Sequence, residues 1–125
     1  MTLQAPLIKG EKKSETSGEQ LRRMCKTIAE EITSGKTERL SDYDSKCEVI
    51  LEAGRFMEDV YDIRYIVDRE KRYYSAELMV AGGGPTIWVN LNTKEVEGYW
   101  GSDRVTEHFI DNLDLDGYCQ EMYGS

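Results

Sequence analysis

Residues 78–101 constrain the fold more than any other part of the chain. They include both tryptophans, five of the eleven glycines and one of the two prolines. Residues 86–90 and 95–100 alternate apolar and polar side chains between turn-forming residues, which is typical of antiparallel strands. Residues 81–85 are predicted to form a turn, or a loop that meets a partner, because consecutive glycines allow positive φ. They lead into a strand and not a helix, so they lack the pattern of a phosphate-binding loop.

Two further predicted strands precede this stretch. Residues 62–68 alternate with a period of two, and residues 73–80 continue that alternation after a turn of charged residues at 69–72. Short turns between successive strands favour antiparallel neighbours. The four segments together predict an antiparallel meander of about four strands.

Helical patterns lie on both sides of the predicted sheet. Thr16 and Glu19 have the spacing of a capping box, and apolar residues then recur every three or four positions until Gly35, which predicts a first helix. A second helix is predicted after Asp42 or Asp44, with apolar positions at Cys47, Ile50, Leu51, Met57 and Val60. A short C-terminal helix is predicted with Asp111 or Asp114 as its cap and with apolar positions at Leu115, Tyr118, Cys119 and Met122.

The predicted fold class is therefore α+β. Two N-terminal helices precede an antiparallel sheet of about four strands in a meander, and a short C-terminal helix follows it. Residues 1–15 mix charged residues, proline and glycine without periodicity, and we expect a flexible N-terminal tail there. At 125 residues, the chain has the length of one core, so residues 16–125 are predicted to be a single α+β domain.

The charge of the chain narrows its partners. The formal net charge is -8, and residues 102–125 carry six acidic residues against one basic residue. A surface of that sign repels phosphate, so we expect no direct binding to nucleic acid, whereas basic protein surfaces are attracted. No apolar run approaches the roughly 20 residues that span a bilayer. We expect no membrane contact and a cytoplasmic location in a bacterial host.

Motifs for metal or cofactor binding were weighed in the acidic segment 111–117. If Asn112 were the first position of a calcium-binding loop, Asp114 and Asp116 would fall at its third and fifth positions. The twelfth position, which needs a glutamate, falls on Tyr123. We therefore predict no metal site and no cofactor, and interpret these acids as a helix N-terminus.

Catalysis has one main candidate, the lone histidine His108. It could pair with a carboxylate or with one of the cysteines Cys25, Cys47 and Cys119. Two of these cysteines lie on predicted core stripes, which favours buried free thiols over reactive ones. We assign no catalytic residue, and a small enzyme that uses His108 is an alternative hypothesis.

Aromatic side chains are the candidate contact residues of the sheet. Ile87 and Val89 share one face of their strand, which places Trp88 on the other. Trp88 is then either exposed or covered by the N-terminal tail or the C-terminal helix. Because tryptophan and tyrosine dominate interface hot spots, we predict a partner-binding surface that comprises Trp88, Tyr99, Trp100, Asp103, Asp111, Asp114, Asp116 and Glu121.

Residues 79–90 (Met-Val-Ala-Gly-Gly-Gly-Pro-Thr-Ile-Trp-Val-Asn), followed by residues 96–104 (Val-Glu-Gly-Tyr-Trp-Gly-Ser-Asp-Arg), carry a family resemblance. They resemble a family of small uncharacterised proteins of bacterial phages and integrative mobile elements. The resemblance covers roughly residues 45–123 and implies a mobile-element accessory protein. Relatives have a cysteine where this chain has Gly82, which argues against a thiol role there. The resemblance transfers no catalytic residue.

Together these features predict a non-enzymatic acidic binding protein of a phage or mobile element. Its expected partner is a host protein or ribonucleoprotein complex with a basic surface, such as a CRISPR effector or a restriction enzyme. The protein would inhibit or modulate that complex by occupying a site built for nucleic-acid phosphates. Two alternatives stay open: the small enzyme that uses His108, and a structural module that pairs an exposed edge strand with its own copy as a possible homodimer.

Overall fold

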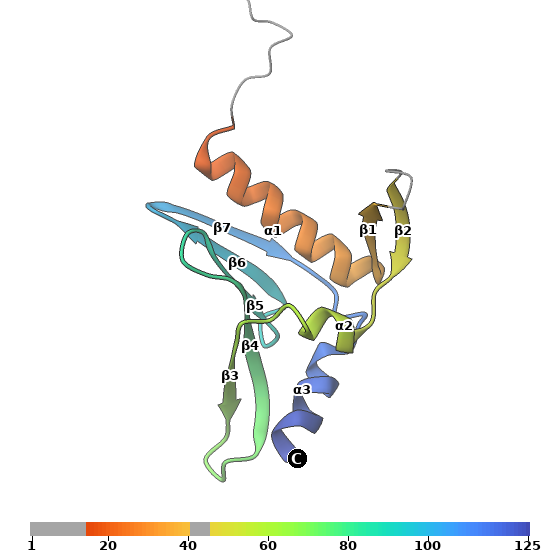
Figure 1. Ribbon diagram of the computed structural model, residues 1–125. Helices are drawn as coiled ribbons and strands as arrows, with labels where there is room; N and C mark the ends of the chain where they lie inside the picture. Colours follow the sequence, from red (N-terminus) through yellow and green to blue (C-terminus); the bar gives the residue numbers. More distant parts are fainter. Residues whose placement is uncertain (1–14, 41–45) are drawn as a thin grey trace, which may run out of the picture.

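The computed structural model describes residues 15–40 and 46–125 (Figure 1). Most of the predicted N-terminal tail, and the predicted caps Asp42 and Asp44, lie outside the described residues. The described elements, in chain order, are α1 (Ser17–Ser34), β1 (Lys36–Leu40), β2 (Lys46–Ile50), α2 (Ala53–Met57), β3 (Asp62–Val67), β4 (Tyr73–Ala81), β5 (Thr86–Asn90), β6 (Glu95–Trp100), β7 (Asp103–His108) and α3 (Leu115–Gly124).

Helix α1 forms where the capping box predicts it. The Thr16 hydroxyl accepts a hydrogen bond from the Glu19 N–H at 3.1 Å, and the Glu19 carboxylate accepts one from the Thr16 N–H at 3.0 Å. Gly35 ends the helix in the left-handed conformation, at φ 71°, which glycine adopts without steric cost. One stripe of α1 is buried in the core, at Leu21, Cys25, Ala29 and Ile32.

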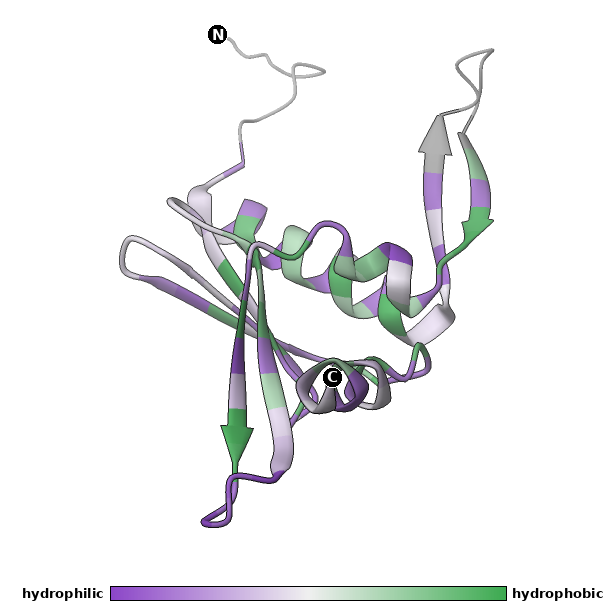
Figure 2. Cartoon of the chain, turned by 60° about the horizontal axis from the view of Figure 1, so that its bottom comes forward, coloured by the Kyte–Doolittle hydropathy of each residue, from purple (hydrophilic) through white to green (hydrophobic). Residues whose placement is uncertain are grey.

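The main sheet is an antiparallel meander in the order β3-β4-β5-β6-β7. The predicted meander is confirmed, but the sheet has five strands and not four, because β7 was not expected. Val105 is the one buried side chain within β7, so the apolar alternation that marks a strand is weak there. The long β3–β4 hairpin ends in a hydrophilic turn (Figure 2).

The second predicted helix is wrong over most of its length. Residues 36–50 form the antiparallel hairpin of β1 and β2, in which Thr37 lies opposite Val49. Val49 and Ile50, the latter 76% exposed, contribute no buried stripe that a helix would need. Only the short helix α2 forms, and its one buried side chain is Phe56.

Both longer helices pack on one face of the sheet (Figure 1): α1 against β6 and β7, and α3 against β4. A glycine permits the close approach of α1, since a Cβ on Gly98 would lie 2.6 Å from the Cys25 sulfur. At the other end, the Tyr73 hydroxyl donates a 2.7 Å hydrogen bond to Asp116. We call this helix-covered side the covered face, and the opposite side the open face.

The predicted C-terminal helix is confirmed as α3, with Asp114 as its N-cap. The Asp114 carboxylate accepts a hydrogen bond from the Gly117 N–H at 3.2 Å. Asp111 also supports this end of the helix, since its two carboxylate oxygens accept from the N–H groups of Leu115 and Asp116 at 2.8 and 3.0 Å. These bonds satisfy N–H groups that have no partner within the helix.

Candidate functional site

The open face is formed by every second side chain of the five strands. The strand register fixes which residues share it: Trp88 lies opposite Met79 and Glu97, and Asn90 lies opposite Glu77 and Glu95. Glu95 in turn lies opposite His108, and Glu77 opposite Arg64. The face therefore carries a central group of three glutamates, which we call the open-face glutamates: Glu77, Glu95 and Glu97.

Asn90 lies at the centre of this group and is 8% exposed. Its side-chain oxygen accepts hydrogen bonds from the N–H groups of Asn92 at 2.9 Å and Thr93 at 3.1 Å, in the turn after β5. These bonds fix the orientation of the amide, so its NH₂ group faces Glu77 at 3.4 Å and Glu97 at 3.5 Å. One neutral amide thus serves two carboxylates.

The electrostatic environment of Glu97 reflects this crowding. Burial raises the pKa of the Glu97 carboxyl, and the negative charges of Glu77 and Glu95 raise it further, while the Asn90 hydrogen bond and Arg104 oppose the shift. Each of these terms acts on the charged form of the carboxyl. The open face therefore favours an added positive charge near Glu97.

Trp88 lies on the open face, as its position in the strand predicts, but it is only 9% exposed. The guanidinium of Arg64 covers the ring, with its carbon 4.3 Å from the ring centroid. The C-terminal helix, which was considered as a cover for Trp88, packs on the covered face. The cover is instead a cation–π contact from the neighbouring edge of the sheet.

Two other predicted aromatic contacts lie on opposite faces. Tyr99 lies on the open face, is 36% exposed, and has the Arg104 guanidinium carbon 5.5 Å from its ring centroid. Trp100 follows it in β6, and therefore belongs to the covered face, where it packs against the hydrophobic core. Tyr99 thus adjoins the open-face glutamates, and Trp100 does not.

The predicted acidic contacts are distributed over the covered face and the α3 end. Asp103 accepts a 2.7 Å hydrogen bond from the Ser17 hydroxyl at the start of α1. Asp111 and Asp114 cap α3, and Asp116 accepts the bond from Tyr73. Glu121 is exposed. The structure does not group these acids with Trp88 and Tyr99, and four of the five hold elements together.

The sequence pattern contained a signal for the residues that were missed. Glu95, Glu97 and Tyr99 alternate with Val96 and Gly98, so they belong to the non-core face of β6. The register that brings Glu77 and Asn90 beside them depends on the bulge between Met79 and Ala81, which sequence alone does not indicate.

His108 lies at the edge of the open face. Its Nε2 is 3.1 Å from Glu95 Oε2, and its side chain is 77% exposed. Cys25 and Cys119 are buried beneath the covered face, and burial raises the pKa of each thiol to about 11. The His108–carboxylate pair considered for catalysis therefore exists, but neither of these thiols lies beside it.

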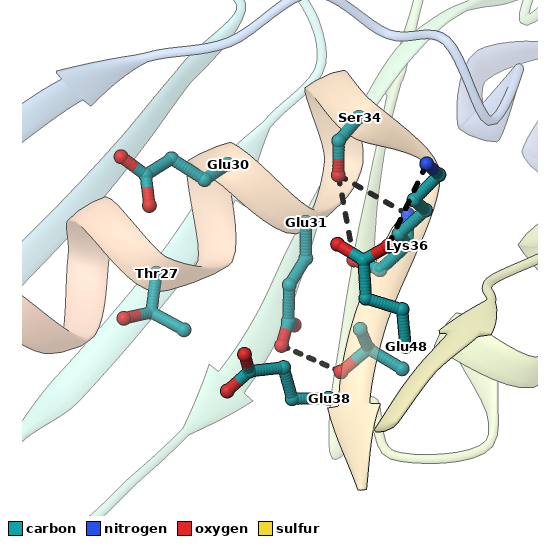
Figure 3. A pocket seen from close by; sticks show the side chains of 8 residues that line it. Thr27, Glu30, Glu31, Ser34, Lys36, Glu38 and Glu48 are labelled. Atoms are coloured by element: carbon teal, nitrogen blue, oxygen red, sulfur yellow. Dashed lines mark hydrogen bonds and ion pairs between the residues drawn. The ribbon is translucent and has the colours of Figure 1, made fainter. Parts of the chain in front are cut away.

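A second acidic feature lies on the helix side of the molecule. The last turns of α1 and the β1–β2 hairpin enclose a groove of about 310 Å³, lined by four glutamates and Lys36 among others. Figure 3 shows Glu31 and Glu38 directed into the same space from α1 and β1. The Thr37 hydroxyl donates to Glu31 at 2.7 Å, and Lys36 lies 3.7 Å from Glu48. We call this feature the acidic groove, with glutamates Glu30, Glu31, Glu38 and Glu48.

Comparison of the chain with models of known protein families, with curated proteins and with solved structures finds no match. Within residues 15–40 and 46–125, no group of three or more His, Cys, Asp or Glu side chains has a geometry that could hold a metal ion. In the same part of the chain, no helix combines the length and the apolar character that crossing a membrane requires.

Proposed function

We propose that this chain is a non-enzymatic acidic binding protein that presents its open face to a basic surface of a host protein or ribonucleoprotein complex. The observation that supports the proposal most is the arrangement of Glu77, Glu95 and Glu97 around a single neutral amide, on the side of the sheet away from α1 and α3. A basic partner would supply the positive charge that these carboxylates lack.

The geometry of the open-face glutamates supports a partner that handles nucleic acid. Glu95 and Glu97 lie on the same side of β6, about 7 Å apart along the strand. Glu77 and Glu95 lie two strands apart, a separation of about 10 Å. Regularly spaced negative charges on a sheet offer a basic groove some of what a phosphate backbone offers it.

The specific proposal is inhibition or modulation of a host defence complex, such as a CRISPR effector or a restriction enzyme. It rests on the resemblance of residues 79–90 and 96–104 to proteins of phages and mobile elements, together with the net charge of -8. A mobile element gains from occupying the nucleic-acid site of such a complex, and an acidic surface is suited to that site.

Capture from a bacterial host lysate followed by competition with nucleic acid tests this proposal. The immobilised chain should retain a nucleic-acid-binding complex at about 0.1 M salt and release it at about 1 M salt, where screening is strong. Duplex DNA or the cognate RNA should displace the chain from that complex. Retention that neither nucleic acid nor salt affects would contradict the proposal, as would the absence of any retained nucleic-acid-binding protein.

Two alternatives have their own supporting observations. The 3.1 Å contact of His108 with Glu95 is the observation for a small enzyme, which a loss of activity in His108→Asn would support. The outer strands β3 and β7 each have one strand neighbour in the described sheet, which is the observation for a self-associating module. A solution mass of one chain at micromolar concentration would count against that module.

A further inference from the structure

The acidic groove is continuous with an apolar cavity. This cavity, of about 190 Å³, is lined by Ile28, Leu51, Phe56 and Val80 at its apolar part and shares Glu31 and Thr37 with the groove. The hydrogen bond between Thr37 and Glu31 marks the boundary of the two. One surface thus offers an apolar cavity beside a negatively charged groove.

We propose that this surface binds an extended segment of a partner protein in which a Lys or Arg residue neighbours an aliphatic residue. The volume supports the apolar half, because an apolar cavity of about 150 Å³ can accept a benzene-sized group. The charge supports the basic half, because four glutamates and one lysine line the groove. The site is separate from the open face and does not depend on the function proposed for it.

The β1–β2 hairpin provides a further reason for a cationic occupant. Glu38 lies directly opposite Glu48 in the register of the two strands, and like charges in that position destabilise a hairpin. Lys36 approaches Glu48 only at 3.7 Å, with both side chains more than half exposed, so this ion pair is weak. A basic side chain of the partner would lie between carboxylates from both strands and from α1.

A labelled peptide of alternating Lys and Leu residues, added to the full chain, tests the proposal without altering the protein. Two peptides of equal length serve as controls: alternating Lys and Ser, which keeps the charge, and alternating Glu and Leu, which keeps the apolar residues. The Lys-Leu peptide should bind at least about ten-fold more tightly than either, a difference of about 1.4 kcal/mol. Equal binding of the Lys-Leu and Lys-Ser peptides would overturn the proposal, as would no binding at all.

Variants locate the bound peptide. Glu38→Gln/Glu48→Gln should weaken binding of the Lys-Leu peptide several-fold, whereas Glu70→Gln/Glu121→Gln, with the same change in net charge, should leave it unchanged. Methyl resonances of Ile28, Leu51 and Val80 should shift when the peptide binds. An equal effect of both double variants, or methyl shifts elsewhere only, would contradict the site.

Two results distinguish this proposal from its neighbours. If the chain is a dimer in solution and the peptide dissociates it, the occupant is a second copy and the heterologous segment is wrong. Peptide binding that survives Glu77→Gln/Glu97→Gln shows that the groove acts independently of the open face. Loss of peptide binding in that variant would place the peptide on the open face and would overturn the groove site.

Discussion

The guanidinium carbon of Arg64 lies 4.3 Å from the centroid of the Trp88 ring. This contact joins edge strand β3 to central strand β5 across the open face, and it leaves the ring 9% exposed. We expect Arg64→Ala to uncover Trp88 and to destabilise the chain by about 0.5–1 kcal/mol, the usual size of such a contact near the surface. Quenching of tryptophan fluorescence by iodide, measured in a Trp100→Phe background, should increase.

Arg104→Ala is the matched control for this prediction. It removes the same type of side chain from the same face, but Arg104 lies over Tyr99 and not over Trp88. Quenching of Trp88 should therefore stay unchanged in Arg104→Ala. If both variants increase the quenching equally, Arg64 is not the specific cover of the ring.

Gly98 sets how closely α1 approaches the sheet. A Cβ at this position would lie 2.6 Å from the Cys25 sulfur and 2.8 Å from a Leu21 methyl group, so Gly98→Ala overpacks the core and should cost about 1–3 kcal/mol. Chemical denaturation measures this loss. Gly124→Ala, where an added Cβ meets nothing within 4 Å, should change stability little.

A double variant tests whether the overpacking at Gly98 is local. Cys25→Ala alone should destabilise the chain by leaving a small cavity. Combined with Gly98→Ala, it should cost less than the two single changes together, because the removed sulfur makes room for the new methyl group. Additive losses would indicate that another neighbour, such as Leu21, limits the approach.

Asp111 is predicted to stabilise α3 through its two hydrogen bonds to backbone N–H groups. Asp111→Ala should lower the free energy of unfolding by about 1 kcal/mol, the typical value of a helix cap. Thermal unfolding measures the effect, with the exposed Glu121→Ala as a control that should be near neutral. A stable Asp111→Ala that loses partner binding would instead support the contact role predicted for this residue from the sequence.

The raised pKa of Glu97 makes stability depend on pH in a defined direction. Its stabilising contribution is fully present below the ordinary glutamate pKa, about 4.3, where the carboxyl is protonated in both states. The contribution is lost as the pH rises through the higher pKa of the folded state. Glu97→Gln should therefore raise the melting temperature at pH 7, and this gain should vanish towards pH 4. A gain that persists unchanged at low pH would exclude this cause.

Much of the fold could be predicted because local signals agreed with the tertiary structure. The capping box at Thr16 and Glu19, the alternation in β3 to β6, and the Asp114 cap each specify an element by contacts within a few residues. The segment 46–60 differs, because its spacing of apolar residues also fits a helix. Val49 and Ile50 pair with β1 in the structure, and nothing in their own sequence shows that pairing.

The candidate site was predictable only in part, for a related reason. Trp88 and Tyr99 follow from strand alternation, so their place on the open face could be expected. The partners of Asp103 and Asp116, namely Ser17 and Tyr73, are 86 and 43 residues away in sequence. Composition suggested an acidic contact surface at those residues, whereas long-range hydrogen bonds engage their carboxylates.

Capture of the host partner by three forms of the chain tests the central claim most directly. The forms are the wild type, Glu77→Gln/Glu97→Gln on the open face, and Glu70→Gln/Glu121→Gln as a control of equal charge. We predict that the open-face variant loses at least about ten-fold of the affinity for a nucleic-acid-binding complex at 0.1 M salt, the scale of close charge pairs at interfaces, while the control retains it. Equal retention by all three forms, or equal loss in both variants, would contradict the open face as the binding surface.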